Sequence, residues 1–352
     1  AGASWGGAGL SFLLVMLCAG CGARQETREV RLYTWADYED PALFAEFERR
    51  TGLRVVVERY SSNEELLARF VAGERSFDVV APSDYMVGIL SRQGHLSRLD
   101  KDLLPGLGRM DRRFLGLPFD PLNDYCVPYA WGTTGLAYDA QRVARPPSSW
   151  LDLWDPRYRG RISLLDDRRE VFAMARQAAS RPGRRSGTGT GPDARGLLGR
   201  LRGQRPIFAS QDLATVARKR EAVLAQAWSG DALRLALERP NWRFVVPKEG
   251  GLLWLDNLCI PVEAPNKEGA HRLVEFLMEA ASGARLARSR RYGCVSTAAS
   301  ALLPEPLRND PLIVLPRGGE AAMAWMLDAP GSSPAEDAAW RELRFRRLGH
   351  GP

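Results

Sequence analysis

A tryptophan and a carboxylate stand close together in the apolar stretch GGLLWLDNLCIP at 250–261. The stretch is bounded by Gly and Pro, which predicts a buried strand. Because strand side chains alternate between faces, we expect Leu252, Trp254, Asp256 and Leu258 to share one face. Burying a carboxylate without a partner is costly. The pattern therefore predicts that a partner group, such as a bound ammonium, lies against Asp256.

Two further carboxylates, Asp167 and Glu170, stand three residues apart in DDRRE, directly before an apolar helical pattern. One interpretation is a helix cap, with Asp167 at the N-cap and Glu170 reaching back to close a capping box. The other is a pair of carboxylates that faces a cleft. The same choice applies to Asp231 in AQAWSGDALR, where an acid at a helix start also suits the helix dipole. Residue spacing alone leaves both interpretations open.

Aromatic and polar residues gather in the motifs YTWADY, PSDYM and AQAWSGD. An aromatic ring face attracts an ammonium by about 0.5–2 kcal/mol, and carboxylates form charge-assisted hydrogen bonds with N–H donors. Rings also bury the methylene chain of a ligand. A linear diamine or polyamine presents both kinds of surface, so this combination points to such a ligand. The residues concerned are Trp35, Tyr38, Ser83, Asp84, Tyr85 and Trp228.

These residues fall at the ends of predicted secondary-structure elements. Strand patterns alternate with helical patterns, the strands at 30–35, 53–60 and 77–83 and the helices at 40–52 and 61–73. This alternation predicts an α/β fold with a mainly parallel sheet. Ligands of such sheets bind at the carboxyl ends of the strands. Trp35 and Ser83 are expected there.

Composition narrows the function further. The 352 residues allow two or three domains, and an apolar content of 45% allows a sizeable core. The net charge is +7, but the basic residues are spread among acids, so we expect no nucleic-acid partner. The three His form no metal or triad pattern, so no metal or cofactor is expected. Cys126, Cys259 and Cys294 have no zinc spacing, allow at most one disulfide, and suit buried free thiols.

Two segments are expected to lie outside the folded body. The apolar run in LSFLLVMLCAGC is too short to span a membrane and is typical of a signal peptide. CAGC at 18–21 resembles the bacterial lipobox, although Cys18 stands where Leu is usual and no Lys or Arg precedes the run. We expect residues 1–28 to be signal peptide, lipid anchor through Cys21, and linker. The Gly-rich segment 181–196 is predicted to be an exposed loop.

Several ordered motifs resemble the spermidine/putrescine-binding proteins of bacterial ABC transporters. They are RLYTWADY, YSSNEELLARFVAG, FDVVAPSDYM, PFDPLNDYCVPYAWGTTGLAYD, SSWLDLWDPRYRGRISLLDDRREVF, VVPKEGGLLWLDNLCIPVEAPNKEGA and RYGCVSTAA. The resemblance implies a two-lobed, type II-like periplasmic-binding-protein fold, in which each lobe is a mainly parallel sheet flanked by helices and a hinge joins the lobes. It implies lobe 1 at 29–133 plus 257–303, and lobe 2 at 134–256 plus 304–347.

The resemblance also implies a function. The family is non-enzymatic; its members capture a polyamine between the lobes and deliver it to an inner-membrane permease. We therefore expect a monomer in the periplasm or at the cell surface, anchored only through its N-terminal lipid. The ligand-binding role carries over to Trp35, Tyr38, Ser83, Asp84, Tyr85, Asp167, Glu170, Trp228, Asp231, Trp254, Asp256 and Tyr292.

Four positions depart from the family pattern and bear on the choice of ligand: Ala36, Asp84, Asp231 and Met326. Asp231 resembles the putrescine-preferring branch, and Met326 replaces a Gln of the spermidine branch. Asp84 acts in the opposite direction, because an extra acid could hold a third ammonium. On balance we expect putrescine to bind at least as tightly as spermidine. The alternatives are another cationic or amino solute, a polyamine sensor and, more remotely, a glycosidase that uses paired carboxylates.

Overall fold

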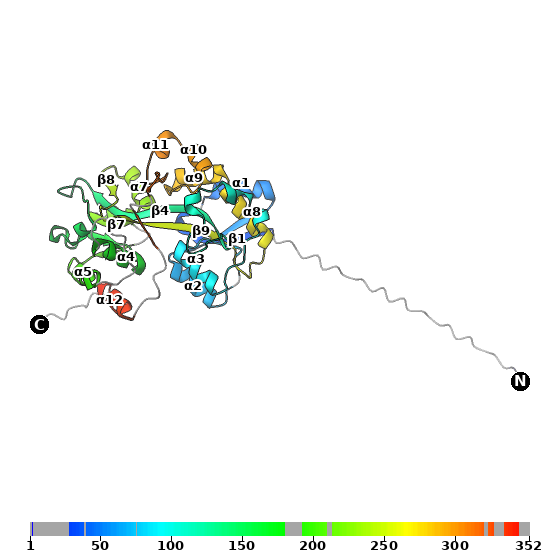
Figure 1. Ribbon diagram of the computed structural model, residues 1–352, viewed down its shortest axis with the longest axis horizontal. Helices are drawn as coiled ribbons and strands as arrows, with labels where there is room; N and C mark the ends of the chain where they lie inside the picture. Colours follow the sequence, from blue (N-terminus) through cyan, green and yellow to red (C-terminus); the bar gives the residue numbers. More distant parts are fainter. Residues whose placement is uncertain are drawn as a thin grey trace.

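The computed structural model describes residues 2, 28–38, 40–74, 76–179, 192–209, 213–319, 323–326 and 334–344. The predicted signal peptide, Cys21 and most of the predicted 181–196 loop lie outside the described residues. In the described ranges, helices pack on a central sheet in two lobes, as predicted (Figure 1). None of the helices in these ranges combines the length and apolarity that crossing a bilayer requires.

The N-terminal part of the first lobe follows the predicted alternation of strands and helices. Its elements are β1 (Glu29–Trp35), α1 (Pro41–Thr51), β2 (Arg54–Tyr60), α2 (Asn63–Val71), β3 (Val79–Val80) and α3 (Asp84–Arg92). Asp40 caps α1, because its Oδ1 accepts from the backbone N–H of Ala42 at 3.2 Å and of Leu43 at 3.1 Å. Gly52 ends α1 with a φ of 72°, a conformation that costs glycine little. β3 is shorter than predicted: Ala81 N–H still donates to Tyr33 O, but the next donor on that side, Ser83 N–H, bonds to Asn63 Oδ1 at 3.2 Å instead of β1.

Two strands connect the lobes. β4 (Cys126–Asp139) pairs antiparallel with β9 (Gly251–Cys259) over its residues 126–134, and with β7 (Leu224–Trp228) over 134–138. Figure 1 shows β4 and β9 running from one lobe toward the other. The sheet order is β2-β1-β3-β9-β4-β7-β5-β6, with β10 (Met323–Trp325) beside β9 and β8 (Trp242–Val245) beside β4. The predicted parallel pairing holds for the outer strands, whereas the centre is antiparallel.

The second lobe surrounds the other end of β4. Its further elements are β5 (Ile162–Leu164), α4 (Arg168–Ala179), α5 (Pro192–Gly203), β6 (Ile207–Phe208), α6 (Leu213–Arg218) and α7 (Ser229–Glu238). The prediction of a loop up to residue 196 is wrong, because α5 begins at Pro192. Proline suits the first position of a helix, and Leu197, Leu198 and Leu201 bury the following turns. Short 3-10 turns cover Ala36–Tyr38, Lys101–Leu103, Pro105–Arg109, Arg112–Phe114, Trp150–Trp154 and Pro156–Tyr158.

The C-terminal segment is mostly helical in its described residues and packs against both lobes. It contains α8 (Lys267–Met278), α9 (Ala280–Arg290), α10 (Thr297–Ala301), α11 (Glu305–Arg308) and α12 (Pro334–Arg344). Ile313, which was assigned to lobe 2, packs with Ala284 and Cys294 near α9 and α10. In contrast, α12 packs on α5 in the second lobe. The chain therefore crosses between the lobes once more, near β10.

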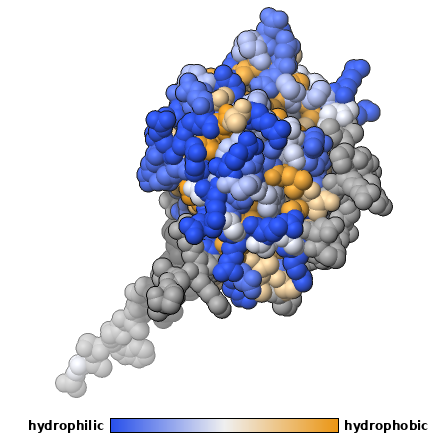
Figure 2. Space-filling view, turned by 90° about the vertical axis from the view of Figure 1, so that its left-hand side faces the viewer, coloured by the Kyte–Doolittle hydropathy of each residue, from blue (hydrophilic) through white to orange (hydrophobic). Residues whose placement is uncertain are grey.

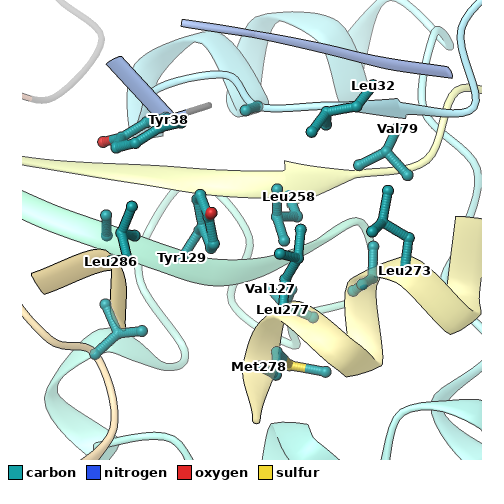
Figure 3. Close-up of a cluster of buried hydrophobic side chains, with 14 of the residues drawn as sticks. Leu32, Tyr38, Val79, Val127, Tyr129, Leu258, Leu273, Leu277, Met278 and Leu286 are labelled. Carbon is teal, nitrogen blue, oxygen red and sulfur yellow. The ribbon is translucent and has the colours of Figure 1, made fainter. Parts of the chain in front are cut away.

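The largest apolar cluster holds the first lobe together. In Figure 3, Leu258 of β9 and Val127 of β4 point toward α8, where Leu273 and Leu277 lie. All four side chains are at most 2% exposed. This rigid core fixes one end of β9, the strand that carries Trp254 and Asp256. The outer face seen in Figure 2 is mostly hydrophilic, with apolar residues in small patches.

Candidate functional site

A cavity lies where the two lobes meet, and it encloses about 580 Å³, including space that is open to solvent. Both lobes and the connecting strand β9 contribute to its wall. The lining residues are Trp35, Ala36, Tyr38, Asn63, Ser83, Tyr85, Asp167, Glu170, Trp228, Trp254, Asp256, Tyr292 and Met326. None of these is Lys, Arg or His, whereas three are acids.

Asp256 is the acid on the first-lobe side of the cavity, and it is only 5% exposed. Its Oδ2 accepts a hydrogen bond from Tyr38 Oη at 2.5 Å, and its Oδ1 accepts one from Ser83 Oγ at 2.6 Å. Burial raises the pKa of Asp256 to about 6, while the two hydroxyls act in the opposite direction. The sequence predicts a partner group for Asp256, and these two neutral hydroxyls fill part of that role. The buried negative charge still has no cationic partner among the described residues that line the cavity.

Aromatic rings form the walls next to Asp256. The ring of Tyr292 lies edge-on to Tyr38, with centroids 5.3 Å apart, and to Trp254, at 5.5 Å. Farther along, Trp35 and Trp228 approach from opposite lobes with centroids 6.5 Å apart. Ring faces and edges therefore surround the space between the acids.

Two glycines make room for these rings. A Cβ added to Gly132 would lie 2.2 Å from Cζ2 of Trp254, and a Cβ added to Gly230 would lie 2.3 Å from Cε1 of Tyr292. Real atoms do not approach so closely, so any larger residue would displace the ring. Both glycines thus position cavity walls without touching the cavity themselves.

Glu170 and Asp167 are the acids on the second-lobe side. Glu170 is 1% exposed, and its Oε1 accepts from Trp228 Nε1 at 2.8 Å and from Thr134 Oγ1 at 3.0 Å. Its Oε2 has no hydrogen-bond partner among the described residues. Burial, and then the charge of Asp167, raise the pKa of Glu170 to about 8. An unpartnered carboxylate oxygen aimed into a cavity is suited to an N–H donor.

Asp167 is the residue for which the helix-cap interpretation is confirmed. Its Oδ1 accepts from the backbone N–H of Arg169 at 2.8 Å and of Glu170 at 3.1 Å, at the start of α4. Glu170 does not close a capping box, because its side chain turns to Thr134 and Trp228 instead. Burial, and then the charge of Glu64, raise the pKa of Asp167 to about 6.

Two predicted ligand residues do not line the cavity. Asp84 is fully buried at the start of α3, where its Oδ1 accepts from the backbone N–H of Tyr85 at 2.7 Å. Asp231 pairs with Arg234 and accepts from Tyr292 Oη at 3.2 Å, and Tyr292 is the lining residue that connects it to the site. Each of these acids bonds to a nearby group at the start of its own helix. For Asp84 this is the backbone N–H of Tyr85, and for Asp231 it is the guanidinium of Arg234.

Asn63 lines the cavity and was missed in the sequence analysis. Its Nδ2 donates to Ser83 Oγ at 3.1 Å and to Tyr85 Oη at 3.0 Å, which orients both hydroxyls. Its only sequence signal is a polar residue after the cap Ser62, and that pattern is also common in ordinary helix starts. The other predicted residues, including Trp35, Tyr85 and Trp228, do line the cavity.

Comparison with known proteins places this architecture in a family. The family model for the bacterial extracellular solute-binding protein matches residues 42–314. The chain is 32% identical over 317 residues to the spermidine/putrescine-binding periplasmic protein of Escherichia coli, covering 90% of this chain and 91% of that protein. It is 29% identical to the putrescine-binding periplasmic protein PotF of the same organism, covering 91% and 92%.

A solved structure agrees with this placement. The putative spermidine/putrescine ABC transporter protein from Listeria monocytogenes superposes with a TM-score of 0.79 at 28% identity, covering 90% of this chain and 97% of that chain. The match extends over both lobes and therefore over the cavity between them. The chain belongs to the bacterial extracellular solute-binding proteins, and its relatives include the spermidine/putrescine-binding periplasmic proteins.

Proposed function

We propose that this protein binds a polyamine in the cavity between its lobes and delivers it to the permease of an ABC transporter. One observation carries the proposal: the described cavity wall holds Asp167, Glu170 and Asp256 among aromatic rings, and none of its described residues is cationic. Ammonium groups supply the missing charge, and the methylenes between them pack on the rings. The named functions of the related Escherichia coli and Listeria proteins support the same ligand class. We propose no catalytic activity.

The arrangement of the acids suits a ligand with charge at both ends. Asp256 belongs to β9 and is held from the first lobe, whereas Glu170 belongs to α4 in the second. A ligand that touches both acids joins the lobes, so binding favours the closed form. We propose that the lobes move about β4 near Thr134 and about β9 near Gly251, where each strand meets neighbours of both lobes. Small-angle scattering should show compaction under saturating polyamine.

The choice between polyamines also follows from the cavity. Asp84 lies outside it, so the argument for holding a third ammonium is removed. Met326 lines it and offers methylene packing rather than a strong hydrogen bond. Asp231 also lies outside the cavity, which removes one argument for putrescine, so our expectation that putrescine binds at least as tightly as spermidine rests on Met326 and on the absence of Asp84 from the wall.

Calorimetry tests the proposed ligand class directly. Putrescine and spermidine are titrated beside 1,4-butanediol, which keeps the four-carbon chain but lacks charge, and beside 4-aminobutanoate, which replaces one ammonium by a carboxylate. Binding of the diamine with no binding of the diol is expected. Equal binding of the diol, or no heat with either polyamine, would overturn the proposal. A preference for 4-aminobutanoate would instead indicate another amino solute.

We also propose that the protein is exported, anchored through Cys21 and monomeric. The relatives carry periplasmic names, and the CAGC motif supports lipidation. Metabolic labelling with a radioactive fatty acid should label the protein and not its Cys21→Ser variant. Light scattering of the soluble form with and without polyamine checks the monomer.

A further inference from the structure

Cys126 and Cys259 lie directly opposite each other on the two strands that connect the lobes. They are cross-strand partners in the antiparallel pairing of β4 with β9. Directly opposed residues of an antiparallel pair have Cα atoms about 4.5–5.5 Å apart and point to the same face. Disulfides need a Cα separation of about 4.4–6.8 Å. The backbone pairing therefore already has the geometry of a disulfide.

The surroundings favour the bond as well. Both side chains are 0% exposed and belong to the same apolar cluster, whereas Cys294 belongs to a different one. Cys126 Sγ donates to Asp120 Oδ2 at 3.3 Å, but that carboxylate also accepts from the backbone N–H of Tyr125 at 2.8 Å and of Cys126 at 3.0 Å. If Cys126 loses its thiol proton on forming a disulfide, Asp120 therefore keeps its two backbone hydrogen bonds.

We propose that Cys126 and Cys259 form a disulfide that joins β4 to β9 at their first-lobe ends. In the structure Cys126, Cys259 and Cys294 are free and buried, as expected, and the proposal concerns the oxidised form of the first two. The bond would cross-link segments far apart in the sequence, and such bonds restrict the unfolded chain strongly. Its position, at the opposite end of the β4–β9 pairing from Thr134, leaves the proposed hinge uncrosslinked. The inference rests on the proposed export for its oxidising environment.

The chemistry is thiol–disulfide exchange with an external disulfide, such as glutathione disulfide or a dithiol oxidase. The thiolate of one cysteine attacks the external disulfide, forms a mixed disulfide and releases one thiol, which takes up a proton. The second cysteine then attacks the bonded sulfur of the first and releases the second thiol. Two protein thiols are oxidised and one external disulfide is reduced to two thiols. Burial raises the pKa of Cys126 in the folded protein, which disfavours the reactive thiolate. The exchange therefore takes place during folding, before the apolar cluster around the two cysteines has packed.

Peptide mapping tests the bond without any variant. The full chain is exported to a bacterial periplasm, quenched in acid, alkylated under denaturing conditions and digested with trypsin without reduction. The expected product is peptide 114–142 linked to peptide 249–267, with Cys294 alkylated in peptide 292–308. A second sample is refolded with glutathione and glutathione disulfide. Linked peptides from the refolded sample support the inference even where export fails. Alkylated Cys126 and Cys259 in the refolded sample overturn it.

Thermal unfolding provides the second readout. A reducing agent is expected to lower the unfolding midpoint by about 5 °C or more, the size expected for one disulfide in a domain of this class. Cys259→Ala should abolish this sensitivity and Cys294→Ala should keep it. An equal midpoint with and without reductant in the wild-type chain would count against the bond. Polyamine titrations of both redox forms test the proposed function separately, because neither disulfide readout depends on ligand.

Discussion

The guanidinium of Arg169, on α4 in the second lobe, lies 4.2 Å from the ring centroid of Tyr85, on α3 in the first lobe. The same side chain reaches Glu64 on α2, with Nε 3.3 Å from Oε1. Tyr85 lines the cavity. Both contacts therefore connect the lobes beside the ligand site and would be lost if the lobes separated.

Arg169→Ala should weaken polyamine binding, because it removes contacts that favour the closed form. A cation–π contact and a half-exposed ion pair together are worth about 1 kcal/mol, or about fivefold in Kd. Calorimetry provides the measurement. Arg168→Ala is the matched control, since Arg168 pairs with Asp337 of α12 within the second lobe and should leave Kd unchanged. Equal Kd values for both variants would remove the inter-lobe role of Arg169.

Asp256→Asn should weaken binding far more than the loss of an acid that does not line the cavity. Truncating one partner of a buried charge pair costs about 2–5 kcal/mol, which is about 30-fold or more in Kd. Tyr38 and Ser83 can still hydrogen-bond to the amide, so the fold should persist. Asp155→Asn, which changes an acid near Arg157 on the second lobe, serves as the control. Circular dichroism of both variants separates misfolding from loss of affinity.

Polyamine affinity should rise with pH between about 6 and 8. The pKa of Asp256 and of Asp167 is raised to about 6, and that of Glu170 to about 8, so these groups ionise across this window. An ammonium binds the ionised forms, and putrescine stays doubly charged over the range. Titrations at pH 6, 7 and 8 provide the test. Glu170→Gln should flatten the rise between pH 7 and 8, and an unchanged slope would show that Glu170 stays ionised throughout.

The stability of the ligand-free protein should fall as the pH rises, whereas its affinity for polyamine should increase. A carboxyl whose folded pKa lies above its unfolded value binds more protons in the folded state. Its stabilising contribution is complete below the unfolded pKa, near 4.5 for Glu170, and is lost as pH rises through about 8. Thermal unfolding without ligand should therefore show a falling midpoint from pH 5 to 8. Saturating putrescine should oppose that fall, because it compensates the buried charge.

Gly132→Ala should impair binding without changing any ligand contact directly. The added Cβ would lie 2.2 Å from Trp254, so the indole must leave its position in the cavity wall. We expect at least a tenfold loss of affinity, which corresponds to about 1.4 kcal/mol. Gly199→Ala on α5 is the control, because nothing lies within 4 Å of its Cβ. The control should raise stability slightly and leave Kd unchanged.

Asp231→Ser is expected to alter putrescine and spermidine binding alike. The carboxylate pairs with Arg234, accepts from Tyr292 Oη and does not line the cavity, so we expect it to orient a ring rather than to hold an ammonium. In the proposed binding mode both ligands contact this ring. Titrating the wild-type protein and the Asp231→Ser variant with both ligands gives the ratio of the putrescine Kd to the spermidine Kd for each protein. A shift toward spermidine of about 1–2 kcal/mol would restore Asp231 as an anchor for putrescine.

Local periodicity was sufficient to predict the order of strands and helices in the first lobe. The spacing of Leu43, Phe44 and Phe47 and the cap at Asp40 depend only on near neighbours, so the chain carries that information within a few residues. The buried strand with Trp254 and Asp256 is readable for the same reason. Most aromatic residues were predicted to line the cavity from the motif resemblance. Residue spacing alone does not show that segments about 200 residues apart in the sequence meet in the fold.

Tertiary structure decided which acids line the cavity. Asp84, Asp167, Glu170 and Asp231 all stand at helix starts, where a cap and a ligand contact have the same sequence pattern. Glu170 reaches the cavity because Thr134 and Trp228 hold its carboxylate there, whereas Asp84 and Asp231 are held by partners of their own helix start. Strand pairing likewise placed Cys126 opposite Cys259 and made β4 and β9 the connection between lobes. These outcomes depend on long-range contacts, and no short stretch of sequence contains both partners of such a contact.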